Sequence, residues 1–179
     1  MGPDAGHLSH PTAAPLVLAD WSIDAGTVVA ACRKELDGLG ALHIVVPAWL
    51  HGLDWAGDPW ASVPCARRQF ERIAQMSVAA GLEVVSAGVG DPDPVSAIGD
   101  AVAAERIDRI LLFGRGRHLS ARYPFSVARR AGRLTGLPVL TFAAPLASQP
   151  SRRGLAAGHC EPTRASGSVR TRPIATLTP

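Results

Sequence analysis

Several short segments carry residue types that could bind a nucleotide or another small anion, and most of them follow apolar runs. An aspartate can accept hydrogen bonds from a base amino group or a ribose hydroxyl. Glycines let a backbone approach a phosphate closely, and the first N–H groups of a helix attract anions. The candidate ligand-binding residues are Asp20, Ser22, Ala48, Gly114, Arg115, Gly116, Ser126 and Val127.

Catalytic and metal-binding signatures have little support in the sequence. Walker A, G-x-S-x-G and H-E-x-x-H motifs are missing. His43 lies in an apolar run, which indicates a core histidine. His51 and Asp54 share a loop as a base and its orienting carboxylate would, but no nucleophile accompanies them. We therefore expect no catalytic residues, no metal site and no enzyme.

Charge is distributed unevenly around the net value of +3. Of the 18 basic residues, 12 lie at or after Arg109, whereas only one of the 15 acidic residues, Glu161, lies after Asp108. The second part of the chain therefore favours anionic partners, although a solvated arginine face with a basic tail is an equally good interpretation.

The 179 residues suit one domain with two tails. We expect a flexible N-terminal tail over 1–14, an α/β domain over 15–145 and a disordered basic tail over 146–179. Neither a secretory signal nor an apolar run of the roughly 18 residues that a membrane span needs is present. The spacing of Cys32, Cys65 and Cys160 argues against a zinc site or a disulfide framework, which favours a cytoplasmic location.

Strands and helices are expected to alternate through the domain. The strand segments are continuous apolar runs, which are typical of a parallel sheet covered on both faces. The fold class is therefore α/β, a doubly wound, Rossmann-like three-layer α/β/α sandwich with a five-stranded parallel sheet. Such sheets bind ligands beyond the carboxyl ends of their strands, where the strand order reverses. The expected strands are 15–20, 41–50, 82–90, 108–114 and 137–144, and the expected helices are 22–40, 65–81, 91–107 and 126–136.

The element order and the segment ILLFGRGRHLSARYPFSVARRAGRLTGLPVLTF resemble the universal stress protein (UspA-like) family. The resemblance implies a UspA-like domain that dimerises through its last strand, and the apolar stretch LPVLTFAA suits such an edge pairing. The short motifs that carry it are Asp20-Trp21-Ser22, Gly90-Asp91-Pro92, Ala97-Ile98, Ser126-Val127 and Pro138-Val139-Leu140.

ATP-binding members of the family have a glycine loop of the form G-x2-G-x9-G-[ST]. Gly114 matches its first glycine, but Gly116 comes one residue too early for the second, and Phe125 replaces the third. Ser126 fits the final position. Trp21 also replaces a glycine beside the expected base contact. The resemblance thus allows ATP as a ligand, while the loop departs from the ATP-binding pattern.

We therefore expect a divergent binding or regulatory module of the universal stress protein type, cytoplasmic and homodimeric, with a nucleotide or another small anion as its ligand. One alternative is an enzyme of nucleotide chemistry, because this layered fold hosts such activities. The other is nucleic-acid association through the basic tail, which the lack of interleaved aromatic residues and of a recognised nucleic-acid fold motif disfavours.

Overall fold

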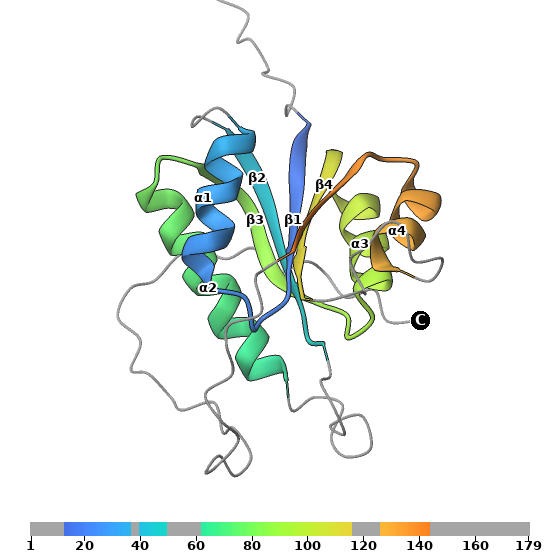
Figure 1. The fold of residues 1–179 in the computed structure, drawn as a ribbon, viewed down its shortest axis with the longest axis horizontal. Helices are drawn as coiled ribbons and strands as arrows, with labels where there is room; N and C mark the ends of the chain where they lie inside the picture. Colours follow the sequence, from blue (N-terminus) through green and yellow to red (C-terminus); the bar gives the residue numbers. More distant parts are fainter. Residues whose placement is uncertain (1–12, 37–39, 50–61, 116–125, 144–179) are drawn as a thin grey trace, which may run out of the picture.

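The fold is a five-stranded sheet between helices, seen in a computed structural model that describes residues 13–36, 40–49, 62–115 and 126–143 (Figure 1). Strands and helices alternate along this part of the chain. The elements are β1 (Ala14–Ala19), α1 (Ala25–Glu35), β2 (Ala41–Pro47), α2 (Val63–Ala79), β3 (Glu83–Gly90), α3 (Pro94–Ala104), β4 (Ile107–Gly114), α4 (Val127–Thr135) and β5 (Val139–Ala143).

All strand pairs are parallel, and the strands lie in the order β3-β2-β1-β4-β5. Helices α1 and α2 lie on one side of the sheet, and α3 and α4 lie on the other (Figure 1). Each side has its own cluster of buried apolar side chains. The predicted fold class, a doubly wound three-layer sandwich, is confirmed. The strand order reverses between β1 and β4, which fixes the place where this fold class binds ligands.

The central strands are buried on both faces, as their apolar sequences predict. Every residue of β1 is buried, and so are the last five residues of β4. The starts of α3 and α4 follow from their local sequences. Asp93 caps α3, with Pro94 in its first turn, and the side chain of Ser126 caps α4 by accepting the Arg129 N–H. Helix α4 ends at Gly136, whose φ of 70° is a conformation that glycine adopts without strain.

Several element boundaries differ from the sequence-based expectation, and two of the helix starts show the physical cause. Helix α1 begins at Ala25, three positions after the expected start, because the side chain of Asp24 accepts the Thr27 N–H at 2.9 Å and caps the helix. Helix α2 begins at Val63, two positions before the expected start, because Pro64 is accommodated in its first turn. Residues 1–12 and 144–179, which include nearly all of the two expected tails, lie outside the described residues.

Within the described ranges, no helix is long and apolar enough to cross a bilayer, and no group of three or more potential metal ligands occurs. Cys32 is a free thiol, and its burial raises its pKa to about 12. Cys65 is disulfide-bonded, contrary to the expectation from cysteine spacing. Disulfides are uncommon in a reducing cytoplasm, so the predicted location remains a prediction.

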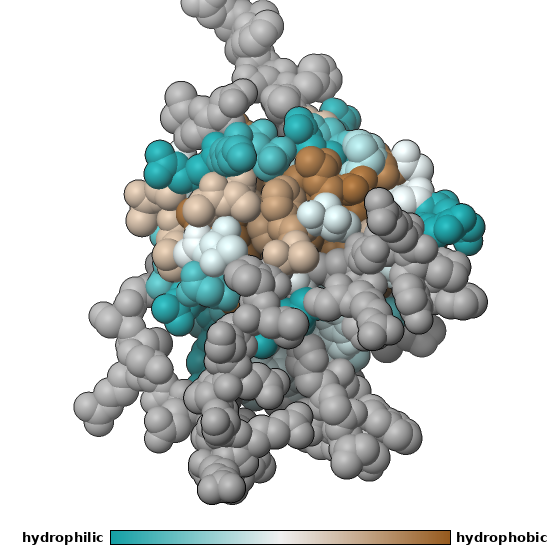
Figure 2. All heavy atoms as spheres, in the orientation of Figure 1, coloured by the Kyte–Doolittle hydropathy of each residue, from teal (hydrophilic) through white to brown (hydrophobic). Residues whose placement is uncertain are grey.

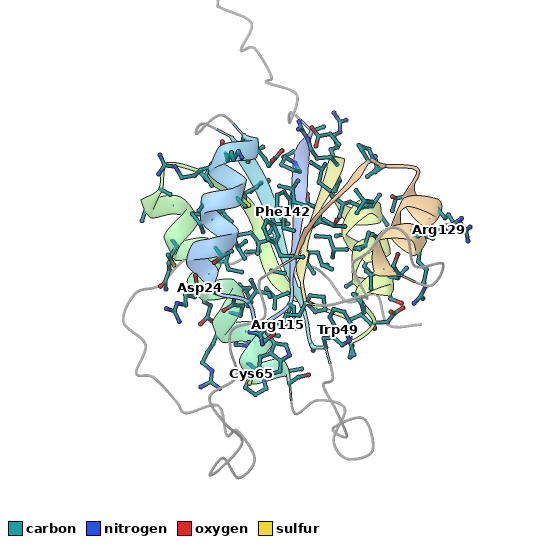
Figure 3. The ribbon with its side chains drawn as sticks, viewed as in Figure 1. Asp24, Trp49, Cys65, Arg115, Arg129 and Phe142 are labelled. Atoms are coloured by element: carbon teal, nitrogen blue, oxygen red, sulfur yellow. The ribbon has the colours of Figure 1, made fainter. Side chains whose placement is uncertain are left out.

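Strand β5 forms an edge of the described sheet and is only partly covered. The ring of Phe142 stacks on Phe113 with 4.5 Å between the ring centroids, and Leu140 packs beside it against the core on the α1–α2 side. The face that carries Phe142 in Figure 3 shows an apolar area in Figure 2. Among the described residues, no strand pairs with the outer side of β5.

Candidate functional site

The candidate site lies at the carboxyl ends of β1, β2 and β4. Asp20, Trp21 and Ser22 follow β1, Ala48 and Trp49 follow β2, and Arg115 follows β4. Parallel strands bring these ends to one edge of the sheet. Arg115 and Trp49 accordingly lie at the same end of the molecule (Figure 3).

Asp20 organises the turn that follows β1. Its Oδ1 accepts hydrogen bonds from the backbone N–H and the hydroxyl of Ser22, both at 2.8 Å. The Asp20 N–H donates to the carbonyl of Phe113 at 3.0 Å, which extends the β1–β4 pairing beyond the strand. The side chain is only 3% exposed. In this arrangement the carboxylate holds the turn rather than facing solvent.

Arg115 connects the turn after β1 to the end of β4. Its guanidinium donates a hydrogen bond to the backbone carbonyl of Ser22. Because β1 and β4 flank the point at which the strand order reverses, this bond spans the expected ligand position. A guanidinium carries five N–H donors, so one bond to a carbonyl leaves it able to bind an oxyanion as well.

Trp21 connects the same turn to the end of β2. The indole Nε1 donates to the carbonyl of Trp49 at 2.9 Å, and the Trp21 ring packs against the apolar cluster on the α1–α2 side. Ala48 is also fixed, because its N–H donates to Gly90 at 3.2 Å and its carbonyl accepts the Ser62 hydroxyl. The ends of β1, β2 and β3 are thereby held together.

In several of these contacts, a side chain donates to a backbone carbonyl at the edge. Donors come from separate parts of the fold, including α2, whose Gln69 donates to the carbonyl of Ile23 at 2.6 Å. Buried carbonyls need such partners, since an unsatisfied one lowers stability. The described part of the carboxyl-end edge is therefore held by hydrogen bonds within the chain.

The start of α4 is a separate part of the candidate site. Ser126 is 1% exposed, and its hydroxyl accepts the Arg129 N–H at 3.2 Å, so this side chain serves as a helix cap. Val127, the first residue of α4, is 6% exposed. Gly114 is the last residue of β4 and pairs with Ala143. Gly116 and Phe125 lie outside the described residues.

The structure thus brings Asp20, Ser22, Ala48 and Arg115 to one edge, as the sequence predicts. Sequence reasoning missed two hydrogen bonds to this edge, one from Ser62 just before α2 and one from Gln69 within α2. Ser62 stands just before a proline-containing helix start, as a cap residue would, but its side chain makes no capping hydrogen bond, so this signal did not indicate its bond to Ala48. Gln69 had no signal beyond being a polar residue among the apolar positions of a helix.

His43 lies away from this edge, within β2, and is a satisfied core histidine as expected. It is 3% exposed, and its Nδ1 lies 2.8 Å from the hydroxyl oxygen of Ser86. Burial lowers the pKa of His43, an effect that the charge of Glu105 opposes. The neutral imidazole is therefore favoured in the folded protein.

Sequence comparison assigns no relative to the chain. No protein-family model matches it, and no curated protein matches it. Its function is therefore inferred from the residues at the sheet edge and their contacts.

Proposed function

We propose that the chain is a binding or regulatory module of the universal stress protein type, and that it binds a small anion beside Arg115. The three-layer fold and the Asp20-Trp21-Ser22 turn after β1 support this proposal. So does the basic character of the second part of the chain. The module acts through ligand binding and not through catalysis.

The observation that carries the proposal is the bond from Arg115 to the carbonyl of Ser22. This bond holds the guanidinium at the edge where this fold class binds ligands. Because the side chain is already held, it loses less conformational entropy on binding an anion than a freely moving arginine would. A planar guanidinium also matches oxyanion geometry better than an ammonium does. Arg115 is thus preordered for a phosphate or carboxylate group.

Binding is favoured over nucleophilic catalysis by the hydrogen bonds of Ser22. Its hydroxyl donates to Asp20, and within the described residues no histidine takes part in the hydrogen bonds of this edge. A serine nucleophile needs a base that can accept its proton and return it to a leaving group.

Calorimetric titration tests this function. Inorganic phosphate, AMP and ATP with magnesium are titrated separately into the full chain and into Arg115→Ala. We expect at least one of these anions to bind, with affinity lowered about tenfold or more in Arg115→Ala, since charge-assisted hydrogen bonds contribute about 1.5–3 kcal/mol.

Arg129→Ala is the matched control, because it removes the same charge from an exposed position on α4, away from Arg115 (Figure 3). Its affinity for the anion should stay close to that of the unsubstituted chain. Equal losses in the two variants would mean that only net charge matters. Absence of binding by all three anions would contradict the proposed function.

The same proposal includes a homodimer formed through β5. Leu140 and Phe142 are half-buried on this strand, and pairing with a second copy would satisfy its outer backbone groups. Light scattering should show a dimer that Leu140→Lys weakens, because a lysine at the interface would lose hydration. Val78→Lys, at an exposed position in α2, is the control. A monomer at all concentrations would contradict the dimer.

A further inference from the structure

The candidate edge has two neighbouring parts, and a different type of side chain lies in each. Between β1 and β4, Arg115 presents a cationic group and bonds to Ser22. Between β1 and β2, the indole of Trp21 reaches from one strand end to the next and bonds to Trp49. One part therefore contains a group that can bind an anion, and the other contains an aromatic ring of the protein.

The size and the fixed position of the Trp21 ring determine what else fits there. An indole and a purine are both fused bicyclic rings of the same size. Trp21 is held by the 2.9 Å bond of its Nε1 and by packing against the apolar cluster on the α1–α2 side. A purine placed over the ends of β1 and β2 would have to displace this ring, breaking both the bond and the packing.

The polar group that could recognise a base is also engaged. Oδ1 of Asp20 accepts two hydrogen bonds from Ser22, and the side chain is 3% exposed. A base amino group that approached this carboxylate would compete with bonds already made inside the chain. On this side of the edge, the Trp21 ring and Oδ1 of Asp20 are therefore both engaged in contacts within the chain.

We infer that Trp21 occupies the base position from within the chain, and that the site is specific for a compact oxyanion such as inorganic phosphate rather than for a nucleotide. This inference rests on the proposed anion binding at Arg115 and names its ligand class. The anion binds between β1 and β4 through the guanidinium, while the indole between β1 and β2 excludes ligands that carry a purine.

The test compares inorganic phosphate with AMP in calorimetric titrations of the full chain, Trp21→Ala and Trp49→Ala. The unsubstituted chain should bind phosphate at least as tightly as AMP. Trp21→Ala should gain about tenfold or more in affinity for AMP, with phosphate affinity little changed. Trp49→Ala is matched in size, and it keeps the backbone carbonyl that holds Trp21, so it should gain nothing.

The outcomes separate this inference from the function on which it rests. Binding of AMP by the unsubstituted chain about tenfold more tightly than phosphate overturns the inference, whether or not Trp21→Ala folds. A folded Trp21→Ala without increased AMP affinity overturns it as well. If the unsubstituted chain binds none of inorganic phosphate, AMP and ATP with magnesium, anion binding at Arg115 fails. In that case a gain of AMP binding in Trp21→Ala would still support occlusion by the indole.

Discussion

The guanidinium of Arg115 donates a hydrogen bond to the backbone carbonyl of Ser22, across the position where the strand order reverses between β1 and β4. On the other side of the same turn, the indole of Trp21 donates to the carbonyl of Trp49 at the end of β2. The turn after β1 is therefore bound to both neighbouring strand ends. Small anions that bind Arg115 would meet an edge whose backbone is already fixed.

Phosphate should raise the thermal stability of the chain through Arg115. A ligand that binds only the folded state stabilises it by about 2.7 kcal/mol at a concentration one hundred times its Kd. Differential scanning fluorimetry should show a rising Tm as phosphate is added to the unsubstituted chain, and a much smaller rise for Arg115→Ala. Sodium chloride at matched ionic strength is the control, and an equal rise in both proteins would contradict specific binding.

Asp20 should matter for stability through the hydrogen bonds that it accepts. Asp20→Ala leaves the N–H and hydroxyl of Ser22 without their acceptor in a turn where Asp20 is 3% exposed. We expect the free energy of unfolding to fall by about 1–3 kcal/mol. Asp20→Asn keeps an acceptor oxygen at the same place and should lose less. Urea unfolding measures both variants, and equal losses would argue that the charge, and not the hydrogen bonds, is what Asp20 supplies.

His43 should make the stability depend on pH in the mildly acidic range. Its folded-state pKa is lowered by burial, so the unfolded chain, with an ordinary pKa of 6.5, binds the proton more readily. The stability that the chain has with a neutral His43 is fully present above about pH 6.5, and it is lost as the pH falls towards the folded-state pKa of His43. Urea unfolding between about pH 5 and 7 should show this loss, and His43→Gln should reduce it.

Ser86→Ala serves as the control for His43, because it removes the hydrogen-bond partner while keeping the titrating imidazole. This variant should be less stable at neutral pH but should still lose stability on acidification. An unchanged pH dependence in His43→Gln would assign the effect to other groups.

The fold was largely predictable because its main signals are local. Continuous apolar runs indicated buried parallel strands, and Asp93 with Pro94 marked the start of α3. The cap of α1 was less clear, since Asp20, Ser22 and Asp24 are closely spaced and all are good cap residues. The hydrogen bond from the Thr27 N–H identifies Asp24 as the cap, while Asp20 and Ser22 bond to each other in the preceding turn. The strand order is set by long-range packing and cannot be read from local patterns.

The candidate site was predictable only in part. The sequence placed Asp20, Ser22 and Arg115 at strand ends, and the topology brought those ends together. The direction of each side chain depends on contacts between distant segments. Gln69 donates to a carbonyl 46 positions away, and Arg115 to one 93 positions away. Opposite His43, a shift in strand register determines that Ser86 is its partner.

Replacement by alanine should change the free energy of unfolding in opposite directions at Gly90, which packs against α3, and at Gly99, which lies within α3. A Cβ at Gly90 would lie 2.6 Å from a methyl group of Val45 and 2.7 Å from the Cβ of Ala97. These buried neighbours cannot easily move, so Gly90→Ala should lower the free energy of unfolding by about 1–3 kcal/mol. A Cβ at Gly99, within α3, would meet only Leu134, at 3.3 Å.

Leu134 is 59% exposed and can shift into solvent, so Gly99→Ala should gain about 0.5–1 kcal/mol from its higher helix propensity. Urea unfolding of the two variants at one pH measures both changes in stability. Titration with the anion shows whether either substitution changes the affinity of the carboxyl-end edge for that anion. The Gly90 carbonyl accepts the hydrogen bond from the Ala48 N–H, so displacement of the end of β3 should also weaken anion binding. Stabilisation by Gly90→Ala would contradict the close packing of β2, β3 and α3.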